Sequence, residues 1–167
     1  MYEPKRASGL NFQITRVYRN PLRSVMNPKF FTVEEANAIV GFLEGTLERI
    51  RLNKRLYLWL NEELEILKLI VGCGAEEANP DSELLKEKTA KFEAVARNIQ
   101  KDITAIHDSG CVLRDIDAGL VDFYSIQDGT VVFLCWQKGE DSLQYFHSIR
   151  SGFKGRQPLM GQQQDLR

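Results

Sequence analysis

Several features that carry function in other proteins are scarce or absent in this sequence. It has only three cysteines, Cys73, Cys111 and Cys135, and no two of them are close enough to form a CxxC pair. The count predicts reduced thiols, with neither a disulfide framework nor a zinc finger. No apolar run approaches the roughly 18–20 residues that span a bilayer, and no apolar secretory segment opens the sequence. We therefore expect a cytoplasmic protein that has no contact with a membrane.

An excess of charge of one sign is also lacking, since the formal net charge is −1. This balance conceals a basic first part, because residues 1–29 carry six Lys and Arg side chains against a single acid, Glu3. Three prolines and the absence of a sustained hydrophobic period predict a flexible leader over 1–29. Such a leader can bind nucleic acid or another polyanion, although a dispensable extension is the favoured interpretation. We expect no nucleic-acid binding elsewhere.

Residues 30–110 show the period of amphipathic helices. Thr32 followed by Glu35 is a capping box, and apolar residues then recur at spacings of three and four. This pattern predicts a long helix over 33–71, with a break near Asn53 as the alternative. A second apolar stripe begins after Asn79-Pro80 and ends at Gly110. Two long helices joined by a short loop predict an antiparallel hairpin.

After Gly110 the apolar residues alternate with polar ones, as in strands. Three runs predict a small antiparallel sheet: residues 111–117, 120–127 and 130–137. Asp128-Gly129 between the last two runs predicts a type I′ turn, and that turn sets a register in which Asp122 lies opposite Cys135.

The predicted fold class is α+β, with a long antiparallel helical hairpin packed beside a three-stranded antiparallel sheet. Leu143, Phe146 and Ile149 lie three residues apart and predict a short C-terminal helix over 141–150. We expect one domain over 30–160, followed by a polar tail over 161–167.

Asp122 carries the most chemical information, because the predicted register surrounds it with apolar side chains. An ionised carboxylate in that position needs a partner, and the candidates are Arg114, His147 and Arg156. One interpretation is a metal centre or general acid–base pair to which four candidate catalytic residues contribute: Asp122, Cys135, Glu140 and His147. The favoured interpretation is a structural ion pair between Asp122 and Arg156 that holds the C-terminal tail on the sheet.

The spacing of the candidate residues argues against a metal site. On one helix Glu140 and His147 would be about 10.5 Å apart along the axis. Ligands of one ion bond it at only about 2.0–2.2 Å. Because the sequence also has no HExxH or HxH motif, we predict no metal site and no cofactor.

Cys135 is a candidate nucleophile if His147 activates it and Asp122 orients the imidazole. A cysteine among apolar strand residues is, however, more often an inert small hydrophobe. The loop at 152–158 is rich in glycine and basic residues, and it makes Lys154 and Arg156 candidate ligand-binding residues for a phosphate or carboxylate. A structural crossover with Phe153 in the core is the alternative for this loop, and both interpretations stay open.

Several segments are similar to one uncharacterised bacterial family. They are FFTVEEAN at 30–37, GLVDF at 119–123, LCW at 134–136, Gly139-Glu140, His147 and GFKGRQPL at 152–159. Over residues 29–159 the chain resembles the domain of unknown function numbered 2203. The resemblance supports the predicted architecture and the place of the candidate site, and it implies no reaction.

The leading functional hypothesis is a non-enzymatic protein-binding module that uses the helical hairpin, with a homodimer as one form. The length of the hairpin motivates this hypothesis, because it exceeds what a small sheet can cover. The alternative is a small-ligand or metal-assisted enzyme whose site lies where the sheet meets the C-terminal tail.

Overall fold

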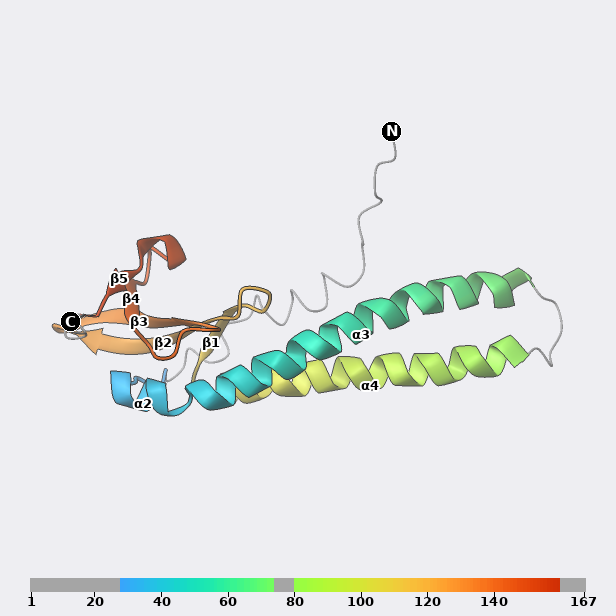
Figure 1. Cartoon of the computed structure of the whole chain (residues 1–167), viewed down its shortest axis with the longest axis horizontal. Helices are drawn as coiled ribbons and strands as arrows, with labels where there is room; N and C mark the ends of the chain where they lie inside the picture. The colour runs from blue at the N-terminus through green and yellow to red at the C-terminus, as the bar shows by residue number, and fades with distance from the viewer. Residues whose placement is uncertain (1–27, 74–79, 160–167) are drawn as a thin grey trace, which may run out of the picture. The chain divides into compact units, whose positions relative to one another are not determined.

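The computed structural model describes residues 28–73 and 80–159 (Figure 1). The contacts divide the chain into two compact units. Of the described residues, 28–38 and 109–159 form the sheet unit, and 39–73 with 80–108 form the hairpin unit. The polar tail and all but residues 28 and 29 of the predicted leader lie outside the described residues. No helix among the described residues is long and apolar enough to cross a membrane.

The sheet unit begins with a short helix, α2 (Val33–Ala38), which the predicted capping box starts. The Thr32 hydroxyl accepts a hydrogen bond from the Glu35 N–H, and the Glu35 carboxylate accepts one from the Thr32 N–H. At the other end of α2, the Asn37 side-chain oxygen accepts a hydrogen bond from the Leu143 N–H at 2.7 Å. The Asn37 contact holds α2 against the part of the chain that carries the sheet.

The hairpin unit consists of α3 (Val40–Cys73) and α4 (Pro80–Asp108). The first helix does not run unbroken from residue 33, because a turn at Ile39 separates α2 from α3, and no break occurs at Asn53. The helices contact each other through apolar side chains, among them Tyr57 and Phe92, whose ring centroids are 4.1 Å apart. The predicted helical hairpin is therefore present, while its packing beside the sheet stays a prediction.

The sheet has five antiparallel strands in the order in which they follow along the chain. They are β1 (Val112–Asp115), β2 (Leu120–Gln127), β3 (Thr130–Gln137), β4 (Tyr145–Ser148) and β5 (Gln157–Pro158). The predicted α+β class is confirmed, whereas the predicted number of strands is wrong. Figure 1 shows α2 along one face of the strands.

The predicted C-terminal helix over 141–150 is also wrong, because β4 occupies this segment. Phe146 pairs with Leu134, and His147 pairs with Phe133. A strand here supplies hydrogen-bonding partners for the backbone of β3, which would otherwise be an open sheet edge. The apolar spacing of three that suggested a helix has no role in this pairing.

The turn between β2 and β3 is the predicted two-residue reversal. Asp128 and Gly129 have φ angles of 49° and 73°, and both are positive as a type I′ turn requires. Gln127 pairs with Thr130, and the register continues without a shift to Leu120 and Gln137. One sheet face therefore carries Val121 and Phe123, and the opposite face carries Asp122.

We expect Gly129→Ala to destabilise the sheet unit by about 1–2 kcal/mol, because an L-residue with a side chain is strained at positive φ. An added Cβ meets no atom within 4 Å, so the loss reports backbone strain alone. Urea denaturation followed by Trp136 fluorescence in a Trp59→Phe background measures it. Gly129→Asn is the matched control and should cost less, because asparagine tolerates this conformation. Equal losses in the two variants would contradict the strain argument.

Candidate functional site

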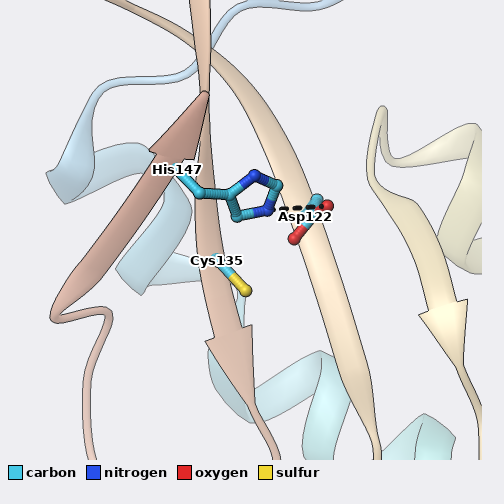
Figure 2. Close-up of side chains that lie close together, drawn as sticks. All are labelled: Asp122, Cys135 and His147. Carbon is cyan, nitrogen blue, oxygen red and sulfur yellow. Dashed lines mark ion pairs between the residues drawn. The ribbon is translucent and has the colours of Figure 1, made fainter. Parts of the chain in front are cut away.

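Three neighbouring strands bring Asp122, Cys135 and His147 together on one face of the sheet (Figure 2). Asp122 of β2 pairs with Cys135 of β3. His147 of β4 pairs with Phe133, two residues before Cys135 on the same strand face. The alternation of side chains in strands therefore directs all three toward a common point. The structure thus unites three of the four candidate catalytic residues.

The three side chains form a small, buried group. Asp122 is 1% exposed, Cys135 0% and His147 3%. Among the described residues, one ligand atom from each of these three lies within 4.8 Å of those from the other two. Figure 2 shows the imidazole directed toward the Asp122 carboxylate, with the Cys135 thiol beside them. Burial of these polar groups requires compensation by charge, hydrogen bonds or a bound ion.

Asp122 lies between two basic side chains. Nε of Arg114 is 2.6 Å from Oδ2 of Asp122, and Nε2 of His147 is 3.3 Å from the same oxygen. Arg114 also lies over the Phe133 ring, with 4.5 Å between its guanidinium carbon and the ring centroid. Two of the three predicted partners of Asp122 are therefore present.

The other carboxylate oxygen of Asp122 has no such partner. Oδ1 is buried and forms no hydrogen bond with any residue that the structure describes. A buried carboxylate oxygen without a hydrogen bond is rare, because its desolvation is uncompensated. Within the buried group, Oδ1 of Asp122 is therefore the atom whose hydrogen-bonding capacity is left unused.

A hydrogen bond of the His147 ring identifies the ring nitrogen that carries a proton. Nδ1 is 2.8 Å from the carbonyl oxygen of Ser148. A carbonyl oxygen only accepts, so this contact requires Nδ1 to be the donor. In the neutral ring Nε2 then carries a lone pair that faces Asp122. The contact between Nε2 and Oδ2 is attractive only when a proton or another cation lies at Nε2.

Cys135 lacks the properties of an activated nucleophile. Burial, with a smaller effect of the neighbouring Asp122, raises the pKa of its thiol to about 12. At neutral pH the side chain is thus an uncharged thiol, whereas nucleophilic catalysis requires the thiolate. The interpretation as an inert small side chain fits this environment better than the triad does.

Glu140, the fourth candidate, lies outside the group and binds Arg156 instead. Nη2 of Arg156 is 2.7 Å from each oxygen of the Glu140 carboxylate and donates to the Cys135 carbonyl oxygen at 3.0 Å. Glu140 also accepts a hydrogen bond from the Gln137 N–H. The Arg156 partner that we expected for Asp122 is therefore wrong, because its guanidinium is engaged by Glu140.

The glycine- and basic-rich loop forms a short 3₁₀ helix, η2 (Phe153–Gly155), followed by β5. Arg156 stacks on Tyr145 with 4.2 Å between its guanidinium carbon and the ring centroid, and on Phe153 with 5.1 Å. The sequence alternative placed Phe153 in the core, but this side chain is 46% exposed. Arg156 thus fixes the loop, while Lys154 is exposed. Ligand binding by these two residues stays a prediction.

The hairpin unit carries a second feature that the sequence interpretation missed. Besides the residues that α3 buries against α4, a second apolar row is exposed or half-buried, and we call it the outer stripe: Leu52, Leu56, Trp59, Ile66 and Ile70. Three of its members recur exactly one heptad apart, and the other two lie four residues after a member. This spacing is visible in the sequence and would have revealed the row.

The chain belongs to the family described as an uncharacterized conserved protein, DUF2203, whose model matches residues 29–159. The comparison with curated proteins and the comparison with solved structures each found no match. The match covers the described strands and the three residues of the buried group.

We expect Arg156→Lys to loosen the segment from β4 to β5, because lysine keeps the charge but loses the planar stacking on Tyr145 and the shared donor to Glu140 and Cys135. Hydrogen bonds of charged groups contribute about 1.5–3 kcal/mol, so local hydrogen exchange should accelerate roughly tenfold or more. Exchange measured by mass spectrometry on peptides spanning 145–158 tests this. Lys154→Gln, a change at an exposed position, should leave the exchange unchanged, and equal acceleration in both variants would contradict the assignment.

Proposed function

We propose that the protein is a non-enzymatic protein-binding module that forms a homodimer through the outer stripe of α3. The observation that supports it is the exposure of the stripe: Leu52 is 49% exposed, Trp59 48% and Ile66 56%. Soluble proteins seldom leave a continuous apolar row on a helix without a partner. The seven-residue spacing is that of a helix that packs along another helix.

The stripe has the same spacing as the row that α3 already buries. Leu43, Ile50, Tyr57 and Leu64 are buried one heptad apart, as in the packed face of a coiled coil. Helix α3 therefore carries two parallel seams, of which α4 covers one. A second helix of matching length would cover the other, and a second copy of α3 has that length by definition.

Charge along α3 favours an antiparallel second copy over an unrelated partner. The first part of the helix carries four basic residues, Arg49, Arg51, Lys54 and Arg55. Three acidic residues follow about two to three turns after Arg55: Glu62, Glu63 and Glu65. When two copies run antiparallel and cross at Trp59, the middle heptad member of the stripe, Lys54 and Arg55 of each copy lie along the acidic segment of the other. A twofold axis makes this complementarity occur twice.

Part of the stripe is held in place before any association. Nζ of Lys88 on α4 lies 4.9 Å from the centroid of the Trp59 ring and 2.8 Å from Oε2 of Glu63. These contacts restrain Trp59 at the edge of the hairpin, so less side-chain entropy is lost when a partner covers it. Tryptophan is also the side chain most enriched among residues that dominate binding.

We expect the full chain to be dimeric, and Leu52→Glu and Ile66→Glu each to convert it to a monomer, because each places a charge within the apolar seam. Light scattering after size-exclusion chromatography, over a series of protein concentrations, measures the mass. Leu58→Glu is the matched control, because Leu58 is 46% exposed on the same helix but lies outside the stripe. A wild-type monomer at every concentration would overturn the proposal, and so would equal disruption by Leu58→Glu.

The second candidate function, binding of a ligand or metal by the sheet unit, is supported by a different observation. Asp122, Cys135 and His147 converge on one buried point. Of the residues assigned to the enzyme alternative, Glu140 and Arg156 are engaged with each other, and this leaves the three-residue group as the part with unused binding capacity.

A further inference from the structure

We propose that Asp122, Cys135 and His147 bind one divalent transition-metal ion of the Zn²⁺ type. The three side chains supply one oxygen, one sulfur and one nitrogen ligand, and these atoms all lie within 4.8 Å of one another. This is the donor set that zinc prefers in proteins. The proposal does not depend on the oligomeric state of the protein.

The spacing of the nitrogen and oxygen donors fits tetrahedral coordination. Nε2 of His147 and Oδ2 of Asp122 are 3.3 Å apart. Two ligands bound at about 2.0–2.1 Å with a tetrahedral angle are separated by about 3.3–3.4 Å. The two donors therefore already stand at the separation that an ion would require. A third ligand from Cys135 leaves the fourth position to a water molecule or a ligand.

Two polar groups in the site lack a favourable partner among the described residues while the His147 ring is neutral. The first is Oδ1 of Asp122, which is buried and has no hydrogen-bonding partner there. The second is Nε2 of His147, whose lone pair faces a carboxylate once Nδ1 donates to the Ser148 carbonyl. A cation that Nε2 and the Asp122 carboxylate both bind replaces the repulsive contact between Nε2 and Oδ2 with two bonds to one ion.

The surroundings of His147 match those of a metal-binding imidazole. Metal-ligating histidines almost always donate the N–H of the other ring nitrogen to a carbonyl or carboxylate, which fixes the tautomer and the ring plane. The Ser148 carbonyl has that role here, at 2.8 Å from Nδ1. Arg114 in turn orients the Asp122 carboxylate through Oδ2. Both ligands are thus held by neighbouring groups before the ion arrives.

Charge also balances when the ion is bound. The ion replaces the thiol proton of Cys135, which passes to solvent, and the new bond joins the metal to the thiolate sulfur. Two positive charges on the ion then meet one negative charge each from Asp122 and Cys135, while His147 is neutral. The ion and its three ligands are together neutral, and the remaining positive charge is that of Arg114, whose side chain is 37% exposed.

From the sequence we expect no metal site, because Glu140 and His147 on one helix would be too far apart to bind one ion. In the structure His147 lies in strand β4, and Glu140 binds Arg156. The three residues that do converge come from three different strands, so their spacing in the sequence has no bearing on the distance between their side chains.

The test uses the full chain, stripped with chelator and then titrated with Co²⁺ as a spectroscopic substitute for Zn²⁺. We expect one ion per chain and a near-ultraviolet charge-transfer band, which arises only when a thiolate binds the metal. Excess Zn²⁺ should remove the band by displacing Co²⁺. Absence of the band in the wild-type protein would overturn the proposal and leave a structural ion pair only.

Variants assign the band to the three residues. Cys135→Ser should abolish it, and His147→Gln should weaken Zn²⁺ binding by more than the roughly 10–100-fold that loss of an outer-shell partner costs. The matched control is a Cys73→Ser, Cys111→Ser double variant, in which Cys135 is the sole cysteine and the band should persist. If the band disappears in this control, another cysteine is the ligand and the proposal fails.

Folding of the variants is checked independently of metal binding. Far-ultraviolet circular dichroism and thermal unfolding without metal show whether Cys135→Ser keeps the native structure. If it does not, nitrogen-15 NMR of the His147 ring in the wild-type protein decides the question. Zn²⁺ should move the Nε2 resonance and leave Nδ1 protonated, and an unchanged Nε2 resonance at saturating Zn²⁺ would overturn the proposal.

Discussion

The sheet unit depends on how it compensates the buried carboxylate of Asp122. An ionised carboxylate without a partner costs several kcal/mol in an apolar environment. Here Arg114 reaches it from β1 and His147 reaches it from β4, at 2.6 and 3.3 Å. Strands on both sides of β2–β3 are thereby tied to one charge at the centre of the sheet face. Removal of Arg114 would leave the acid buried with less compensation, and His147 compensates it only with a proton or a cation at Nε2.

A feature of the fold or of the site could be predicted from the sequence when the residues that specify it are adjacent in the chain. The β2–β3 register follows from two adjacent residues, Asp128 and Gly129, whose conformational preference specifies a type I′ turn, so the pairing of Asp122 with Cys135 was predictable and is confirmed. The capping box at Thr32 is equally local and is confirmed. The position of His147 beside them was not predictable in detail, because it requires β4 to pair with β3 across a connection with no comparable turn signal.

The predictions that were wrong depend on contacts between residues far apart in the sequence. Residues 141–150 were predicted as a helix because three apolar residues recur every three positions, but the segment's partner is the edge of β3, which no local pattern reveals. On α3 two apolar rows share the same seven-residue period, and the row that α4 buries accounts for the helix on its own. The outer stripe therefore escaped the sequence interpretation, although Leu52, Trp59 and Ile66 are regularly spaced. Arg156 was paired with the wrong acid for a similar reason, since Glu140 comes near it only through the fold.

The structural ion pair and the metal site on this sheet face have the same physical origin, the buried carboxylate of Asp122. A buried acid with flanking bases is a structural ion pair while His147 holds a proton at Nε2, and it becomes a metal site when an ion takes that proton's place. The contact of Arg114 is the same in both states, because its side chain is 37% exposed and contacts Oδ2 of Asp122 in each of them. What distinguishes them is Oδ1 of Asp122 and the thiol of Cys135, neither of which an ion pair with His147 uses. In the ion pair Cys135 keeps its thiol proton, whereas a bound ion replaces that proton. The cysteine opposite Asp122 is therefore the residue whose chemistry separates the two states.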